Sequence, residues 1–259
     1  MANGEIEIPW GRWFDKVYCC WYMPSKGRYE RLKGEMERLG LWGSPLFELR
    51  KMVPQRMEEV VLEWSRRQPG GCTRLFAVGL GMENIRIMKE ALLSGYRRIM
   101  IIEDDAAFLK DKGEIVRILD AMPEGFGMVQ MDKAIHNQRE VEFYDRLLSE
   151  RRINEHYVDC REGCFTLSTC NVYTREGMEK VVAEMEAKMA IIDCVAGWIP
   201  TEPAVAVKNL AVQIVYGKCN NKVFYDKLEA MHSIYKLQGL DYADYEVPEG
   251  YGYGGIVPE

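Results

Sequence analysis

The spacing of apolar side chains in the first hundred residues predicts strands that alternate with helices. Residues 17–22 and 98–102 are short apolar runs bounded by charge, which is typical of strands buried on both faces. In residues 29–39 and 84–95 apolar positions recur at helical spacing, and a glycine closes each segment. This order predicts an α/β domain with a mostly parallel sheet and helices on both faces.

The same patterns continue in the second half of the chain. Residues 128–132 and 164–173 are expected to form strands, and Thr174 is expected to cap a helix with an apolar stripe from Met178 to Met185. Residues 220–237 indicate a further amphipathic helix, before a tail at 242–259 rich in Tyr, Gly and Pro. We therefore expect a main domain over residues 1–218 and an appendage over residues 219–259 packed on it.

Three consecutive carboxylates, Glu103, Asp104 and Asp105, follow the predicted strand 98–102 directly. Ligands of open α/β sheets bind beyond the carboxyl ends of the strands. Adjacent carboxylates repel one another, and oxygen ligands suit Mg²⁺ or Mn²⁺. The triplet therefore indicates a divalent cation site, with a solvated acidic turn that caps the next helix as the alternative.

Several short segments occur in an order that carries a family resemblance. They include Pro24-Ser25-Lys26-Gly27-Arg28 after the first strand, Gly95-Tyr96 before Ile101-Ile102-Glu103-Asp104-Asp105, Cys170-Asn171-Val172-Tyr173 and Ile192-Asp193. In this order they resemble glycosyltransferase family 25, the lipooligosaccharide and collagen galactosyltransferase group, over about residues 16 to 215. The chain departs from the family at Glu83-Asn84, where the family usually carries Ser-His.

The resemblance implies a GT-A-like nucleotide-diphospho-sugar transferase fold and a metal-dependent, inverting hexosyl transfer. The donor would be a nucleotide sugar such as a UDP-sugar, with galactose as the family default, and the acceptor a glycan or other hydroxyl, as in lipopolysaccharide biosynthesis. By resemblance, Asp105 ligates Mn²⁺ or Mg²⁺, Asp104 contacts the ribose and Glu103 orients the loop.

An inverting reaction also needs a carboxylate that takes the acceptor proton. Asp193 holds the position of the family's acidic step, with Asp132 and Glu202 as alternatives, although Asp193 could equally cap a helix. Arg28 and Arg31 follow the first strand, where a guanidinium could meet the nucleotide or simply lie on a helix surface.

Two other functions remain open from the sequence. The Glu83-Asn84 departure favours a non-catalytic member that binds nucleotide or glycan without turnover. A metal-dependent phosphotransferase or hydrolase could use the same acids, but the ordered resemblance disfavours it. A dinucleotide site at Gly79-Leu80-Gly81 is disfavoured because the third glycine is missing, so this pair is expected to shape a turn before the helix at 84–95.

The composition of the chain indicates which classes of partner it can bind and in which cell compartment it is expected. The chain has 259 residues, of which 47% are hydrophobic, so it can bury a full hydrophobic core. Its net charge of −6 argues against nucleic acid as a partner. No apolar run approaches the roughly 20 residues that span a bilayer, and the N-terminus lacks a signal-peptide pattern, so we expect a cytoplasmic protein, with peripheral membrane association and the oligomeric state left open.

The eight cysteines are expected to be free thiols, because they are too few to staple a chain of this length and no secretion signal is seen. Cys19 and Cys20, adjacent on a predicted strand, should point to opposite faces. His156, Cys160, Cys164 and Cys170 have zinc-ligand types, but their spacings are wider than those of a zinc knuckle.

Overall fold

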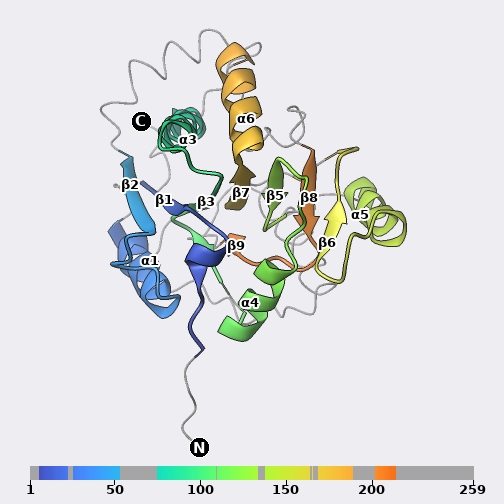
Figure 1. Ribbon diagram of the computed structural model, residues 1–259, viewed down its shortest axis with the longest axis horizontal. Coiled ribbons are helices and arrows are strands. Elements are labelled where there is room, and N and C mark those ends of the chain that lie inside the picture. Colours follow the sequence, from blue (N-terminus) through green and yellow to red (C-terminus); the bar gives the residue numbers. More distant parts are fainter. Residues whose placement is uncertain are drawn as a thin grey trace, which may run out of the picture.

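A seven-stranded sheet covered by helices on both faces forms the frame of the molecule (Figure 1). The computed structural model describes residues 6–22, 26–52, 75–108, 110–133, 138–163, 165, 169–188 and 202–213. The strands are β1 (Lys16–Tyr22), β2 (Phe47–Met52), β3 (Arg98–Glu103), β4 (Ala106–Ala107), β5 (Met128–Gln130), β6 (Tyr157–Asp159), β7 (Cys170–Thr174), β8 (Pro203–Ala206) and β9 (Val212–Gln213). The α-helices are α1 (Lys26–Arg38), α3 (Leu75–Leu93), α4 (Lys112–Asp120), α5 (Gln138–Glu150) and α6 (Arg175–Lys188), and a 3₁₀ turn, η1, covers Trp10–Arg12.

The strand order in the main sheet is β2-β1-β3-β7-β5-β8-β6, and β4 pairs separately with β9. Strands β2, β1, β3, β5 and β8 run in one direction, whereas β7 and β6 run against it. The predicted α/β class, with a mostly parallel sheet and helices on both faces, is confirmed. We call the edge where β1, β3, β5 and β8 end the carboxyl edge of the sheet.

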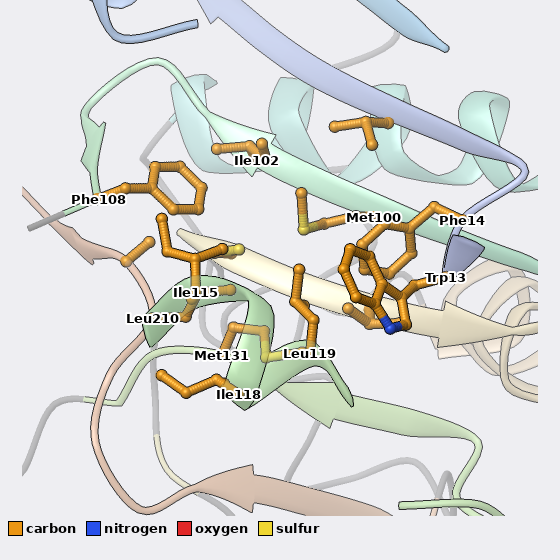
Figure 2. Packing of buried hydrophobic residues seen from close by; sticks show 14 of the residues in the cluster. Trp13, Phe14, Met100, Ile102, Phe108, Ile115, Ile118, Leu119, Met131 and Leu210 are labelled. Carbon is orange, nitrogen blue, oxygen red and sulfur yellow. The ribbon is translucent and has the colours of Figure 1, made fainter. Parts of the chain in front are cut away.

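Alternate residues of each strand pack against helices on opposite faces of the sheet. Val17 and Cys19 of β1 belong to the core that includes α1 and α4, whereas Tyr18 and Cys20 belong to the core that includes α3 and α6. Figure 2 shows the first core, in which Ile115, Ile118 and Leu119 of α4 pack near Met100 and Ile102 of β3. The prediction that Cys19 and Cys20 face opposite ways is therefore confirmed.

The predicted strands and helices near β1, β3 and β7 agree with the structure, with one error at α3. Strands β1 and β3 match the predicted segments within one residue, and Thr174 caps α6 by accepting a hydrogen bond from the Gly177 N–H (3.2 Å). The prediction that Gly79 and Gly81 form a turn before a helix is wrong, because α3 already begins at Leu75. Each glycine costs a helix about 1 kcal/mol relative to alanine, and the packing of α3 on the sheet and on α6 offsets that cost.

Some predicted segments cannot be compared with the structure. The strand predicted over 164–173 appears as β7 from Cys170 onward, while 164 and 166–168 lie outside the described residues. The predicted helix at 220–237, the tail at 242–259 and the domain boundary at 218 lie outside them too. Within the described residues, no helix is long and apolar enough to cross a membrane.

Candidate functional site

The order of the strands reverses between β1 and β3, and this creates a natural binding position. The chain leaves β1 through α1 toward β2 on one side, and later returns through α3 to place β3 on the other side. Helices α1 and α3 accordingly cover opposite faces of the sheet. In open α/β sheets, the loops at such a reversal diverge and leave a crevice beyond the carboxyl ends of the strands.

The acidic turn, residues 103–105, lies at this reversal. It connects the end of β3 to β4, and the Glu103 N–H donates to the carbonyl oxygen of Thr169 (2.9 Å). Asp104 and Asp105 are 3% and 6% exposed, so the fold buries both carboxylates where a surface turn would expose them. Strand β4 then pairs with β9, which brings the residues near 212 back to this side of the molecule.

Helix α1 holds the backbone of this turn through three polar side chains on one face, Arg31, Glu35 and Arg38, which we call the α1 polar stripe. Arg31 donates from Nη2 to the carbonyl oxygen of Asp104 (2.7 Å) and from Nη1 to that of Ala106 (2.9 Å). Glu35 accepts from the Phe108 N–H (2.7 Å), and Arg38 donates to the Phe108 carbonyl oxygen (2.5 Å). The turn is thus anchored to α1 by main-chain contacts from Asp104 to Phe108.

The pKa of the Cys19 thiol is raised by burial and shifted further by charges of the acidic turn and of Arg31. Burial is the largest cause that raises the pKa of Cys19. Asp104 and Asp105 raise that pKa further, whereas Arg31 lowers it. Arg31 also binds the carbonyl oxygen of Asp104, so its positive charge lies at the acidic turn and offsets part of the repulsion between the two aspartates.

Asp132 follows β5 at the same edge, on the other side of β7. It is fully buried, and its Oδ1 accepts a hydrogen bond from the Cys170 N–H (3.1 Å). Cys170 begins β7, and its carbonyl oxygen accepts from the Met131 N–H (3.0 Å). The Asp132 carboxylate is thus part of the junction between β5 and β7.

Lys133, which sequence reasoning missed, is buried beside Asp132. Burial lowers its pKa to about 7, and the Asp132 carboxylate opposes that shift. An ammonium group suits the site because it has three N–H donors for the three oxygen acceptors around it. The partners of Nζ are the carbonyl oxygens of Ala206 (2.7 Å) and Val207 (2.9 Å), Oδ1 of Asn209 (3.1 Å) and the ring of Tyr144, whose centroid is 4.7 Å away.

Aromatic side chains stand at the end of β1. The rings of Trp21 and Tyr29 lie 4.7 Å apart, and Tyr29 also packs edge-on against Trp42 (5.8 Å). The buried Nε1–H of Trp21 has no hydrogen-bond partner among the described residues. Trp21 and Trp42 pack against the core that includes α1 and α4.

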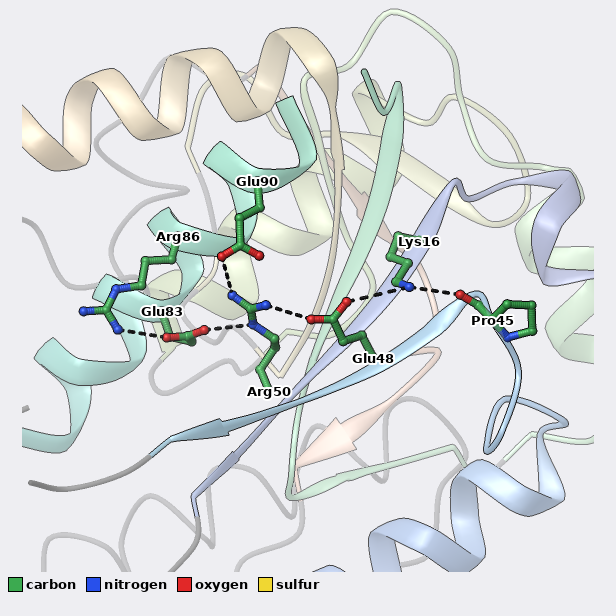
Figure 3. A network of polar contacts seen from close by, with 7 residues as sticks. All are labelled: Lys16, Pro45, Glu48, Arg50, Glu83, Arg86 and Glu90. Carbon is green, nitrogen blue, oxygen red and sulfur yellow. Dashed lines mark hydrogen bonds and ion pairs between the residues drawn. The ribbon is translucent and has the colours of Figure 1, made fainter. Parts of the chain in front are cut away.

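A network of ion pairs joins β2 to α3 (Figure 3). Burial acts to lower the pKa of Arg50, but hydrogen bonds to three glutamates outweigh it and hold the pKa above its usual value. Glu83, part of the departure from the family pattern, is one of these partners (2.9 Å), and Asn84 donates to the carbonyl oxygen of Leu80 (2.9 Å). Both side chains at the departure are therefore engaged within the protein.

The structure brings together some of the predicted site residues and separates others. Glu103, Asp104, Asp105, Arg31 and Asp132 all lie at the carboxyl edge. Glu202 precedes β8, so it lies at the opposite edge, where it pairs with Arg161 (3.8 Å) and Lys180 (4.0 Å). Asp193 and the side chain of Arg28 lie outside the described residues.

The described residues fit a divalent cation only as part of a shared site. Among them, no group of three or more His, Cys, Asp and Glu side chains is arranged to hold a metal ion. Mg²⁺ and related ions, however, commonly bind through one or two carboxylates together with substrate phosphates. Asp105 therefore suits a site that a bound diphosphate completes.

The described cysteines, Cys19, Cys20, Cys160 and Cys170, are buried thiols that form no disulfide. Burial raises the pKa of Cys19, Cys20 and Cys170, which keeps these thiols protonated and unreactive. The other four cysteines lie outside the described residues, so the state of all eight stays a prediction.

Comparison with known proteins gives only distant similarity. No protein-family model matches the chain, and no curated protein matches it significantly. Mouse xyloside xylosyltransferase 1, in its apo form, is similar over 72% of this chain and 79% of its own, with 8% identity and a TM-score of 0.35. A Thermus thermophilus protein described as mannose-1-phosphate geranyltransferase is similar over 74% and 73%, with 14% identity and a TM-score of 0.31. TM-scores this low mark a partial similarity of chain path and identify neither the family nor the reaction.

Proposed function

We propose that the chain is a glycosyltransferase that moves a hexosyl group from a nucleoside diphosphate sugar to an acceptor hydroxyl. The observation that carries the proposal is the acidic turn at residues 103–105, which follows a central strand where the strand order reverses. This position is where open α/β sheets bind their ligands. The ordered resemblance to glycosyltransferase family 25 supports a UDP-sugar, with galactose as the default.

The roles of the acidic residues follow from the chemistry of the leaving group. Asp105 holds Mn²⁺ or Mg²⁺ together with the diphosphate, and Asp104 contacts the ribose. A bound ion would supply positive charge that stabilises the leaving diphosphate. Glu103, whose N–H is tied to Thr169, keeps the turn in register with β7.

Asp193 is the proposed general base that takes the acceptor proton. Of the alternatives, Glu202 lies at the opposite edge of the sheet, and Asp132 uses its carboxylate to accept from a backbone amide of β7. Asp193→Asn should lower turnover by about a hundredfold or more with UDP affinity nearly intact.

The test is a thermal-shift screen of nucleoside diphosphate sugars with and without Mn²⁺, followed by an assay for donor hydrolysis. We expect stabilisation by UDP that depends on Mn²⁺, and slow release of free sugar from the correct donor. A protein whose melting temperature responds to no nucleotide, with or without the metal, would contradict the proposal.

A non-catalytic nucleotide or glycan binder is the second candidate. It is favoured by Glu83 and Asn84, which replace the family's Ser-His and are engaged with Arg50, Arg86 and Leu80. The hydrolysis assay separates the two candidates, because a binder would show the Mn²⁺-dependent stabilisation without any release of sugar.

A further inference from the structure

Arg31 lies on helix α1 and contacts the main chain of the acidic turn, so it can control the conformation of that turn. Its two terminal nitrogens reach the carbonyl oxygens of Asp104 and Ala106, which flank Asp105 on both sides. We infer that Arg31 is the positioning residue of this turn, and that it sets the direction of the Asp105 carboxylate. The identity of the ion that this carboxylate meets rests on the proposed function.

The geometry of the contact requires a guanidinium group. The planar fork of arginine directs two N–H groups from different nitrogens, so it can bind two carbonyl oxygens at once. A lysine ammonium is a compact point charge on a flexible stem and would not hold both carbonyls in the same relation. Arg31→Lys therefore keeps a positive charge near the acidic turn. It should loosen the backbone between the carbonyls of Asp104 and Ala106.

The other two residues of the α1 polar stripe also bind the main chain that follows the acidic turn. Glu35 and Arg38 lie four and seven residues after Arg31, which places them on the same face of the helix. Through Phe108 they bind the chain on the far side of β4. The turn is thus braced at both ends by one rigid helix, which is how precise ligand geometry is usually maintained.

This role differs from direct recognition of the nucleotide, the role that the sequence suggested for Arg31. In the structure, both terminal nitrogens of Arg31 point at backbone carbonyls of the turn. Because Arg31 also binds the carbonyl of Asp104, the proposed ribose contact, a positioning residue should weaken UDP binding more with the metal than without it. A residue that contacts the nucleotide should weaken UDP binding equally in both conditions. The two roles therefore predict different metal dependence.

The experiment compares wild type, Arg31→Lys and the control Lys33→Gln. Lys33 lies on the same helix, but its ion pair is with Glu37 of α1 (3.8 Å) and not with the turn. Mn²⁺ binding is followed by the electron paramagnetic resonance of the free ion, with UDP present because a diphosphate completes the proposed site, and against UDP and Mn²⁺ without protein. UDP binding is followed by calorimetry with and without Mn²⁺. We expect Arg31→Lys to weaken Mn²⁺ binding roughly tenfold to a hundredfold. The loss of UDP affinity should be smaller without the metal than with it, and Lys33→Gln should equal wild type.

Hydrogen exchange of the amides of residues 105–108 provides a readout that does not depend on any ligand. We expect faster exchange there in Arg31→Lys than in Lys33→Gln, with equal melting temperatures. If Arg31→Lys melts too early to be titrated, Glu35→Gln weakens the next contact of the stripe and should show the same pattern.

Three results would overturn the inference: equal Mn²⁺ affinity in Arg31→Lys and wild type, an equal loss of UDP affinity with and without Mn²⁺, or unchanged exchange at residues 105–108. If wild-type protein binds neither Mn²⁺ nor UDP, the proposed function fails by itself. Hydrogen exchange then decides the positioning role alone.

Discussion

Two acidic segments flank β7 at the carboxyl edge, and the protein holds them in different ways. After β3, Arg31 donates to the main chain of the turn, at the carbonyls of Asp104 and Ala106. After β5, the Asp132 side chain itself accepts from the Cys170 amide. The first arrangement shapes a loop around its carboxylates, whereas the second uses a carboxylate to join two strands. Function is therefore expected in the first segment and stability in the second.

Asp105→Asn should have the largest effect on ligand binding. The change removes one anionic oxygen ligand, so Mn²⁺-dependent UDP binding should weaken about a hundredfold, or about 2.7 kcal/mol. Stability without ligand should stay the same or rise, because one of the crowded negative charges is gone. Melting curves of both proteins, with and without UDP and Mn²⁺, test this. Equal ligand-induced shifts would show that the turn is not the metal site.

Asp132→Ala should act on stability instead. It leaves the buried Cys170 amide without its acceptor, which should lower the free energy of unfolding by about 2 kcal/mol. Asp132→Asn keeps an acceptor oxygen and serves as the control, with a smaller loss expected. Urea unfolding measures both. An Asp132→Ala protein of normal stability but without turnover would instead make Asp132 a catalytic residue and remove the contrast between the two segments.

Lys133, in the segment after β5, should make the free energy of unfolding depend on pH. Its pKa is about 7 in the folded protein and about 10.4 in an unfolded chain. Between these values unfolding takes up a proton, so the free energy of unfolding should rise with pH. We expect wild type to gain about 1 to 2 kcal/mol relative to Lys133→Met between about pH 7 and about pH 8.5. Urea unfolding at several pH values gives this difference, and parallel curves for the two proteins would show that Lys133 is not desolvated in the folded state.

Gly34→Ala should have the smallest effect and tests α1 away from its polar stripe. Gly34 lies on the exposed side of α1, and an added Cβ would meet nothing within 4 Å. Alanine should therefore stabilise the helix by about 0.5 to 1 kcal/mol. UDP and Mn²⁺ affinities should not change. A change in either affinity would mean that the helix as a whole, and not the stripe, controls the turn.

The strands beside the candidate site could be predicted because their signals are local. Strands β1 and β3 are apolar on both faces, and such runs are recognisable without knowledge of their neighbours. Strand β2 was missed because it lies at the edge of the sheet and carries Glu48, Arg50 and Lys51. The charge of Arg50 is acceptable there only because carboxylates from β2 and α3 surround it. The start of α3 could not be predicted because Gly79 and Gly81 have low helix propensity. The packing that stabilises this part of the helix exists only in the folded protein.

The sequence by itself determined that a buried strand ends in three carboxylates, that helices alternate with strands, and that Cys19 and Cys20 face opposite ways. These are properties of a few neighbouring residues, set by helical and strand periodicity. Only the tertiary structure decided that Arg31 braces the acidic turn, that Lys133 is buried beside Asp132, and that Glu202 lies at the far edge. The physical reason is the order of the strands: β7 enters antiparallel between β3 and β5, and this long-range pairing sets which loops meet at each edge of the sheet.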